Sequence, residues 1–259
     1  MPTAERLKGV NVVVTRPAHQ ANALCELISD VGGDTIRFPV LAITKPSQPL
    51  ALDQAQAKIS SANLVIFISP NAVEYGMKII QDTGGIPENV QVAAVGQGTA
   101  KLLRQLGRPA DIFPTHQYNS EALLGMSELQ FVSGQQIVIF RGEGGRELLA
   151  DTLRSRGATV EYIECYQRIR PDTDTQELHA ALVAKSVNAV VVTSNQGLQN
   201  LHDILDPDDF TLLKNVQLFV VSDRGQRLAV ELGFTLPAII ASKASDHGIL
   251  DSLLEWNAN

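Results

Sequence analysis

The sequence has few of the residues that support disulfide, metal or covalent chemistry. Its only two cysteines, Cys25 and Cys165, lie in apolar surroundings without CxxC spacing, which excludes a disulfide framework and predicts packing roles. The five histidines form no HExxH motif or paired spacing, so no metal site is expected. There is also no G-x-S-x-G elbow, and neither cysteine has an evident activating partner.

Long hydrophobic runs and a surplus of positive charge are also absent. Apolar runs such as residues 189–192 are far too short to span a bilayer, and the opening MPTAERLKG lacks the apolar core of a signal peptide. The formal net charge of −7 argues against a general nucleic-acid binder, because phosphate contacts require a basic face. We therefore expect a cytoplasmic protein that binds neither membranes nor nucleic acid.

Short apolar runs alternate with helical patterns along the chain. Runs near residues 12, 64, 92, 137, 190 and 218 are each followed by a helical pattern, at 21–31, 72–80, 99–106, 147–156, 197–205 and 226–232. Apolar runs without polar alternation, each followed by a helix, indicate parallel strands that are buried on both faces. The fold class is therefore α/β, and a length of 259 residues favours two domains.

The chain contains an internal repeat. VNVVVTRPAHQANALCELISDVGG aligns with QQIVIFRGEGGRELLADTLRSRGA, so that Arg16 falls on Arg141, a shift of 125 (141 − 16). The same shift places Asn63 on Asn188, and a shift of 126 aligns the block at residue 90 with that at residue 216. A nearly constant offset through three blocks indicates duplication, with each half supplying about five strands, enough for one doubly wound sheet.

The stretch RGEGGREL, residues 141–148, follows a buried run and precedes a helix, as phosphate-binding loops do. It lacks the G-x-G-x-x-G spacing, and its duplicate, residues 16–20, reads RPAHQ with no glycine. We therefore interpret the glycines as relief of backbone strain in a strand-to-helix turn, and we expect no nucleotide here.

Polar residues gather where the predicted strands end, the edge at which open α/β sheets bind ligands. Small hydroxyls there, such as Thr99, Ser120 and Ser194, either cap a helix or leave its amides free for an anion. Taken singly, such a residue caps a helix more often than it binds a ligand. Six such edges together, however, offer amides, hydroxyls and arginines with hardly any carboxylates, a surface that suits a polyanionic ligand.

Two segments differ from the other apolar runs. Residues 160–168 alternate in polarity and lead into Arg170-Pro171, and their duplicate, residues 35–46, ends at Lys45-Pro46. We interpret both as linkers that cross between two lobes, with Tyr166 at the hinge. The alternative is a tyrosine packed under the linker with its hydroxyl at the surface.

An ordered set of motifs resembles the uroporphyrinogen-III synthase family over essentially the whole chain: VVVTRP, VIFISPNAVEY, AVGQGTAKLL, IVIFRGEGGRELLADTLRSRGATVEYIECYQR and VVVTSNQGL. Each motif alone is weak, whereas their order and spacing are specific. The resemblance implies two similar doubly wound lobes, each a five-stranded parallel sheet, joined by a two-segment linker. The lobes would be residues 1–40 with 172–259, and residues 45–166, with linkers at 41–44 and 167–171. Each lobe would then combine strands from both halves of the repeat.

The resemblance also implies a lyase reaction without a cofactor. Hydroxymethylbilane, a linear tetrapyrrole with eight carboxylates, would lose its terminal hydroxyl to give an azafulvene, which ring D attacks through its substituted carbon. The spiro intermediate breaks and recloses as uroporphyrinogen III, with ring D inverted, in tetrapyrrole (haem, sirohaem or chlorophyll-type) biosynthesis. Because the bilane closes unaided to the wrong isomer, selection of a bent conformation is the main task of the enzyme.

Other expectations concern partners and alternatives. The resemblance implies a monomer that makes transient contact with the preceding pathway enzyme. Two other classes stay open: a non-catalytic two-lobed small-molecule binding protein, and a sugar-phosphate isomerase-like enzyme. Turnover of hydroxymethylbilane would separate them.

Carried over position by position, the resemblance gives Tyr166 a catalytic role in the departure of the hydroxyl, as a proton donor or through a water. The expected substrate-binding residues all lie at strand ends or in cleft loops: Thr15, Arg16, Ser69, Asn71, Gly96, Thr99, Asn119, Arg141, Gly142, Gly144, Ser194, Asn195 and Arg224. The sequence departs from the family pattern at Ile68, where threonine or serine is common, and at residues 222–224, where a Gly-Pro loop with threonines is common.

Overall fold

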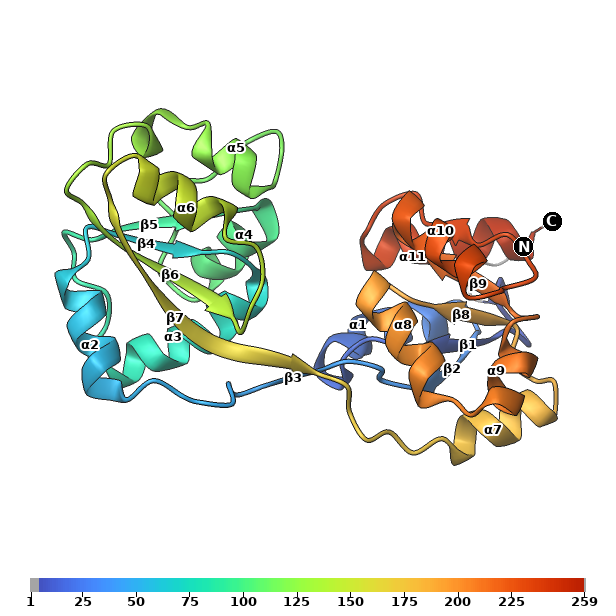
Figure 1. Cartoon of the computed structure of the whole chain (residues 1–259). Coiled ribbons are helices and arrows are strands. Elements are labelled where there is room, and N and C mark those ends of the chain that lie inside the picture. The colour runs from blue at the N-terminus through green and yellow to red at the C-terminus, as the bar shows by residue number, and fades with distance from the viewer. Residues whose placement is uncertain (1–4, 259) are drawn as a thin grey trace. The chain divides into compact units, whose positions relative to one another are not determined.

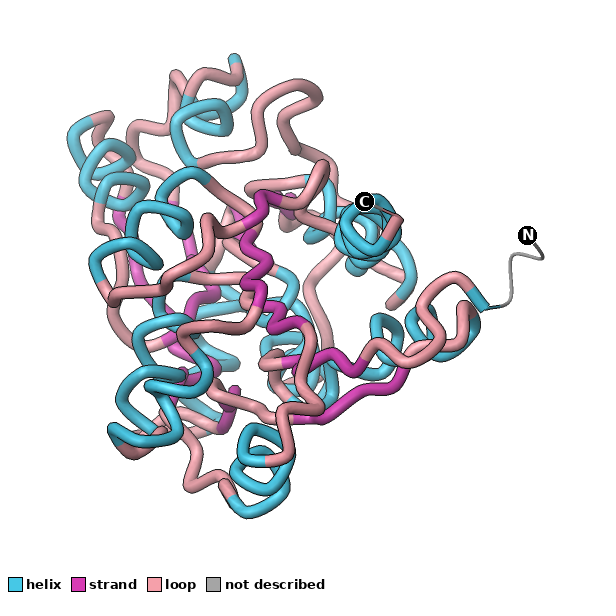
Figure 2. Tube along the Cα trace, turned by 90° about the vertical axis from the view of Figure 1, so that its right-hand side faces the viewer, coloured by secondary structure: helices cyan, strands magenta, loops and turns pink. Residues whose placement is uncertain are grey.

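The computed structural model describes residues 5–258 and divides into two compact units (Figure 1). Unit 1 comprises Met1–Ala42 and Ile169–Asn259, and unit 2 comprises Ile43–Arg168. Each unit contains a five-stranded sheet with helices on both of its faces, as the ribbon view shows (Figure 1). Figure 2 shows the same chain from the side, with helices and strands in different colours. The predicted fold class, two similar doubly wound α/β lobes, is confirmed.

The sheet of unit 1 has the strand order β10-β9-β8-β1-β2, and every pair in it is parallel. The strands are β1 (Asn11–Val14), β2 (Asp34–Arg37), β8 (Ala189–Val191), β9 (Gln217–Val220) and β10 (Ile239–Ile240). The helices are α1 (Ala18–Asp30), α7 (Gln176–Val183), α8 (Asn195–Ile204), α9 (Pro207–Leu213), α10 (Asp223–Glu231) and α11 (Asp246–Asn257). Val12 and Val14 face the core under α1 and α11, while Val13 faces the core under α7 to α10, which explains the unbroken apolar run.

The sheet of unit 2 has the order β3-β7-β6-β4-β5. Its strands are β3 (Ala42–Thr44), β4 (Leu64–Phe67), β5 (Gln91–Ala94), β6 (Gln136–Gly142) and β7 (Thr159–Ile169). Its helices are α2 (Leu52–Ser61), α3 (Pro70–Asp82), α4 (Gln97–Gln105), α5 (Ser120–Leu124), α6 (Leu148–Ser155) and the short 3₁₀ helix η2 (Ser127–Leu129). Helices α5 and α6 cover one face. On the other face α3 packs so closely on the stacked rings of Phe67 and Phe140 that only glycine fits at Gly76.

Residues about 125 apart in the sequence occupy equivalent places in the two sheets. In unit 1, Val13 of β1 pairs with Val190 of β8; in unit 2, Val138 of β6 pairs with Val65 of β4 (138 − 13 and 190 − 65 are both 125). The order β2-β1-β8-β9 of unit 1 thus corresponds to β7-β6-β4-β5 of unit 2. Each sheet therefore combines the first two strands of one half with later strands of the other half.

The match of Asn63 with Asn188 has a structural reason. The Asn63 Oδ1 accepts the backbone N–H of Gln136 at 2.8 Å, and the Asn188 Oδ1 accepts that of Asn11 at 2.8 Å. Each asparagine also donates its own N–H to the carbonyl of the same partner, at 2.8 and 3.0 Å. This reciprocal pair satisfies the first backbone groups of the central strands and fixes their register in both sheets.

The interpretation of residues 35–46 and 160–168 as crossing linkers is wrong for most of their length. Residues 34–37 form β2 in unit 1, and residues 42–44 form β3 in unit 2. Strand β7 pairs with β6, from Thr159 opposite Gln136 to Tyr166 opposite Gly142. Polar alternation reflects a strand near the sheet edge, where one neighbour is only the short β3. The chain passes between the units at residues 42–43 and 168–169.

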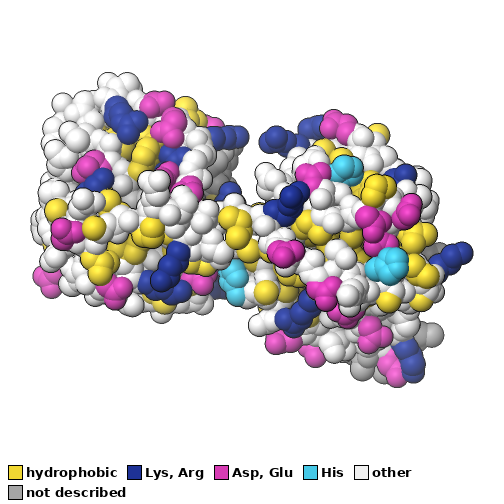
Figure 3. Space-filling view, turned by 60° about the horizontal axis from the view of Figure 1, so that its bottom comes forward, with side chains coloured by type: hydrophobic (Ala, Val, Ile, Leu, Met, Phe, Trp, Pro, Cys, Tyr) yellow, Lys and Arg dark blue, Asp and Glu magenta, His cyan; other side chains and the backbone are white. Residues whose placement is uncertain are grey.

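The surface carries charges of both signs. On the face shown in Figure 3, Lys and Arg side chains alternate with Asp and Glu, and no extended patch of one sign appears on that face. A negative net charge therefore does not prevent local sites for anions.

Lys185 provides a test of the helix-end geometry of α7. Its φ is 54°, in the left-handed region. The Lys185 N–H donates to the Leu182 carbonyl at 3.0 Å, and the Ser186 N–H donates to the Ala181 carbonyl at 3.0 Å, which is the hydrogen-bond pattern of a helix C-terminus. Lys185→Gly removes a left-handed strain and should raise the free energy of unfolding by about 0.5–1 kcal/mol in urea titrations. The control Ala184→Gly, at a φ of −71°, should lower it instead. Destabilisation by Lys185→Gly would contradict the assignment.

Candidate active site

A cavity of about 400 Å³ lies at the carboxyl end of the unit 2 sheet. We call it the β6 cavity. Its lining comes from the ends of β4, β6 and β7, from the turn at residues 143–146 and from the start of α6. A second hollow of about 360 Å³, the α4 hollow, shares Ile68 and Ser69 with it and extends to Tyr118 and to residues 96–99 at the start of α4. Both belong to the sheet edge at which α/β proteins bind ligands.

Tyr166 is buried beside this cavity, with 2 % of its surface exposed. Its hydroxyl lies 3.2 Å from the Ser69 Oγ and accepts a hydrogen bond from Arg168 Nη2 at 3.4 Å. Its ring centroid is 6.0 Å from that of Tyr75, and its carbonyl accepts the N–H of Glu143 at 2.8 Å. The tyrosine is thus fixed at its ring, its backbone and its hydroxyl, and the surface-hydroxyl alternative is wrong because the hydroxyl is held among protein groups.

Gly142 makes room for the Tyr166 ring. A Cβ at this position would lie 2.6 Å from the Tyr166 Cε2 and 2.7 Å from its Cζ, closer than real Cβ atoms approach. The pairing of β6 with β7 shifts between Arg141 and Gly142, so that Gly142 stands opposite Tyr166. The structural role of Gly142 is therefore to allow close contact between a strand and an aromatic ring.

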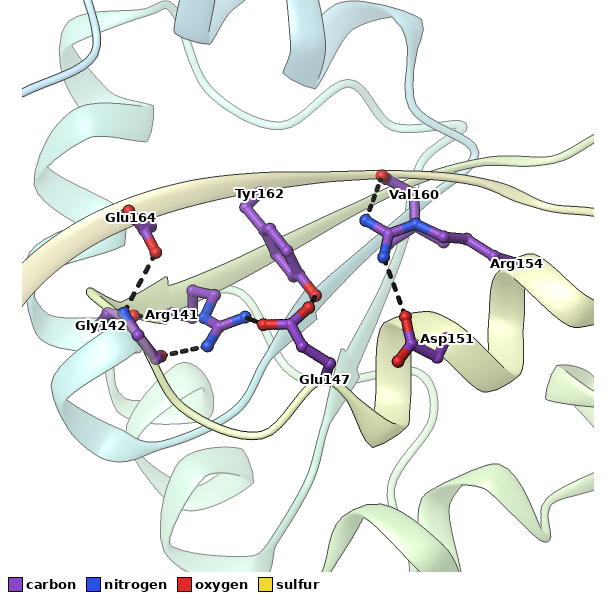
Figure 4. A network of polar contacts seen from close by, with 9 residues as sticks. Arg141, Gly142, Glu147, Asp151, Arg154, Val160, Tyr162 and Glu164 are labelled. Atoms are coloured by element: carbon purple, nitrogen blue, oxygen red, sulfur yellow. Dashed lines mark hydrogen bonds and ion pairs between the residues drawn. The ribbon is translucent and has the colours of Figure 1, made fainter.

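Arg141 is buried, with 3 % of its surface exposed, and its guanidinium is occupied by protein groups (Figure 4). Nη1 donates to Glu147 Oε1 at 2.8 Å, Nε donates to the Gly142 carbonyl at 3.2 Å, and Nη2 donates to the Gly144 carbonyl. The guanidinium carbon also lies 4.5 Å from the centroid of the Tyr162 ring. Arg141 is expected to bind substrate and lines the β6 cavity, but each of its three guanidinium nitrogens already donates to a protein acceptor.

The sequence analysis expects hardly any carboxylates at the strand ends, and this prediction is wrong for unit 2, where Glu143, Glu147 and Glu164 lie at the edge. Glu143 accepts hydrogen bonds from the Ser47 Oγ at 2.8 Å and from the Ser47 N–H, and Glu164 accepts the Gly144 N–H at 3.3 Å. Hydrogen bonds from Tyr162 and then from Arg141 hold the pKa of the Glu147 carboxyl below its usual value. These carboxylates are compensated by donors of the same unit, so the edge does not repel an anion as strongly as their number suggests.

The other expected residues of unit 2 lie around the same edge. The Ser69 Oγ caps α3 by accepting the Ala72 N–H at 3.1 Å, and the Asn119 Oδ1 caps α5 by accepting the Ala122 N–H at 2.8 Å. Asn71 is partly exposed near the start of α3. Gly96 begins α4 without a side-chain cap, and Thr99 is buried in its first turn. Ser69, Gly96 and Thr99 all line the α4 hollow.

The expected residues of unit 1 fall into two groups. Thr15 is buried and donates to the Val191 carbonyl at 2.8 Å, and Arg16 is paired with Asp246, so both serve the fold of the unit. The remaining three are at least partly exposed at the carboxyl edge: Ser194, which caps α8, Asn195, which donates to the Arg224 carbonyl at 3.4 Å, and Arg224 itself. The structure brings these three together.

Sequence reasoning missed several residues of the site, among them Tyr162, Glu147 and Arg168. Tyr162 and Arg168 line the β6 cavity together with Tyr166, and Glu147 joins Tyr162 to Arg141. The available signal was the period of two in residues 159–169. If that segment is interpreted as a strand, alternation places residues 162, 166 and 168 on the same side.

Residues 5–258 contain neither a cluster of metal ligands nor a helix suited to a membrane. No group of three or more His, Cys, Asp or Glu side chains in that range could hold a metal ion. Within the same range, no helix has the length and apolar character needed to cross a membrane.

Comparison with solved structures supports the fold. The uroporphyrinogen-III synthetase of Helicobacter pylori superposes with a TM-score of 0.62 at 14% identity, over 95% of this chain and 99% of that one. A mutant uroporphyrinogen III synthase of Thermus thermophilus gives a TM-score of 0.61 at 19% identity, over 96% and 98%. Identities this low show similarity of fold alone.

Sequence comparison reaches further. Residues 22–251 match the family model described as uroporphyrinogen-III synthase HemD. The uroporphyrinogen-III synthase of Escherichia coli K12 is 32% identical over 247 residues, which cover 94% of this chain and 100% of that protein. The corresponding protein of Synechococcus elongatus is 31% identical over 202 residues, covering 77% of this chain and 76% of its own. The chain therefore belongs to the uroporphyrinogen-III synthase family.

Proposed function

We propose that this chain catalyses the closure of hydroxymethylbilane to uroporphyrinogen III, with inversion of ring D and loss of water. Family membership supports the reaction, and neither alternative, a non-catalytic binding protein or a sugar-phosphate isomerase, has support from the relatives. The observation that supports our proposed location for it is that the hydroxyls of Tyr166 and Ser69 lie 3.2 Å apart where the β6 cavity adjoins the α4 hollow.

The first step that we propose there is departure of the terminal hydroxyl. Arg168 Nη2 donates to the Tyr166 oxygen, so the Tyr166 O–H is left to donate to the Ser69 Oγ. The Ser69 O–H is then available to protonate the leaving hydroxyl, which departs as water when its C–O bond breaks. The pyrrole N–H proton returns to the protein as the neutral azafulvene forms, so the protein ends unchanged.

The second task that we propose is to hold the bilane in a bent conformation through its carboxylates. Helix α4 begins at Gly96 without a side-chain cap, so the amides of Gln97 and Gly98 are available to an anion in the α4 hollow. Arg146, with 80 % of its side chain exposed, and Arg168 supply positive charge at the β6 cavity. Binding the bent form more tightly than the extended form selects the route to the type III isomer.

The proposal changes the expected set of binding residues. Ser69, Gly96, Thr99, Asn71, Asn119 and Gly144 stay in it at the edge of unit 2, and Ser194, Asn195 and Arg224 stay in it at the edge of unit 1. Thr15, Arg16, Arg141 and Gly142 leave it, because each is used by the protein itself. On the resemblance alone, we also propose a cytoplasmic monomer that serves haem or related tetrapyrrole synthesis.

The isomer ratio of the product tests the reaction. When freshly generated hydroxymethylbilane is mixed with the protein, we expect predominantly uroporphyrinogen III, because an enzyme that selects the bent bilane outruns the spontaneous closure to type I. Separation of the oxidised products by chromatography measures the ratio. Type I alone, formed at the rate of a protein-free control, would refute the proposed function.

Gly142→Ala tests whether the Tyr166 hydroxyl must be held in place. The new methyl group must displace the Tyr166 ring, whose nearest atom lies only 2.6 Å from it, and we expect turnover to fall about 10- to 100-fold. In a double-mutant cycle, Gly142→Ala combined with Tyr166→Leu should cost no more than Tyr166→Leu alone. Additive losses, or full activity of Gly142→Ala, would show that the glycine does not act through the tyrosine.

A further inference from the structure

We propose that Arg141 is a positioning residue that shapes the turn at residues 142–146 for substrate binding and does not itself contact the substrate. This role rests on the proposed function and deepens it, because it names Arg141 as the residue that keeps the carboxylate-binding turn ordered. The contacts of Arg141, its charge balance and the geometry of the peptide groups in the turn carry it.

The guanidinium of Arg141 forms the centre around which the turn closes. Its Nε and Nη2 donate to the carbonyls of Gly142 and Gly144, which lie on both sides of Glu143. A Cβ on Gly145, whose φ is 112°, would lie 2.9 Å from Nη2. A planar fork with donors in fixed directions suits this arrangement, and a flexible ammonium group does not.

The positive charge of Arg141 is balanced inside unit 2. Glu147 accepts its Nη1 at 2.8 Å, and the other Glu147 oxygen accepts the Tyr162 hydroxyl (Figure 4). The Tyr162 ring covers the guanidinium at 4.5 Å. Arg141 therefore adds almost no net charge to the β6 cavity, in contrast to the exposed Arg146, whose nearest described carboxylate, Glu121, is 3.6 Å away.

The peptide geometry of the turn shows what this positioning achieves. In a trans peptide the N–H points opposite to the carbonyl of the preceding residue. Because the Gly144 carbonyl points to Arg141, the Gly145 N–H points away from it, and Gly145 lines the β6 cavity. Among residues 5–258, no acceptor bonds the N–H of Gly145 or of Arg146. Arg141 thus turns the Gly145 amide outward, where a carboxylate of the substrate can accept from it.

Kinetics of three variants test the proposal. Arg141→Gln and Arg141→Lys should both raise KM for hydroxymethylbilane about tenfold and change kcat less than about threefold, because both disorder a binding element. The control Arg154→Gln should leave KM unchanged, since Arg154 contacts the same Tyr162 ring at 5.5 Å but bonds only Asp151 and Val160, outside the turn. Arg141→Lys should also keep the wild-type salt dependence of KM, because it keeps the charge that balances Glu147.

Two results would overturn the proposal. If Arg141→Lys keeps the wild-type KM while Arg141→Gln loses affinity, the charge of Arg141 matters and its planar fork does not, and the positioning role is refuted. Hydrogen exchange without substrate gives the second test. The amides of Glu143 and Gly144, which donate to the Tyr166 carbonyl and to Glu164, should exchange at least about tenfold faster in both Arg141 variants but not in Arg154→Gln. Unchanged exchange would refute the positioning role even if the wild type is active. Faster exchange in a wild type that makes no type III product would refute the proposed function alone.

Discussion

The contact of the Tyr166 ring with the bare backbone of Gly142 determines the rest of the site. The ring can lie there only because the pairing of β6 and β7 shifts at Gly142, and the shift allows the Glu143 N–H to bond the Tyr166 carbonyl. The same shift begins the turn that closes around Arg141 and places the Tyr166 hydroxyl beside Ser69. A single steric fit between a strand and a side chain thus joins the candidate proton relay to the candidate carboxylate loop.

The internal repeat supplied two similar sheet edges that have since diverged. Arg16, just after β1, and Arg141, near the end of β6, hold equivalent positions in the two halves, and each is paired with a carboxylate of its own unit, Asp246 or Glu147. Only the second copy has glycines after the arginine, with positive φ at Gly144 and Gly145. These two fit the interpretation of the glycines as relief of strain, whereas Gly142 is required for space.

The sequence predicted much of the fold and only part of the site. Apolar runs and helical periodicity locate the central strands, because burial on both faces leaves a direct imprint on composition. The same patterns identify Ser69, Gly96 and Ser194 at strand ends. They do not show which partner a polar side chain has, so they do not predict the pairing of Arg141 with Glu147 or of Arg16 with Asp246. Strand β7 was misread because its polar alternation comes from its place near an edge, a property of the whole sheet.

The central claim is that the carboxyl end of the unit 2 sheet binds the tetrapyrrole, and protection of backbone amides from hydrogen exchange by uroporphyrin III tests it most directly. The account predicts protection at residues 68–70, 96–99 and 142–146, which line the β6 cavity and the α4 hollow. Unit 1 has another hollow, of about 440 Å³, between Leu182, Val187 and Val216. Protection there, with the three segments of unit 2 exchanging as in the free protein, would contradict the account.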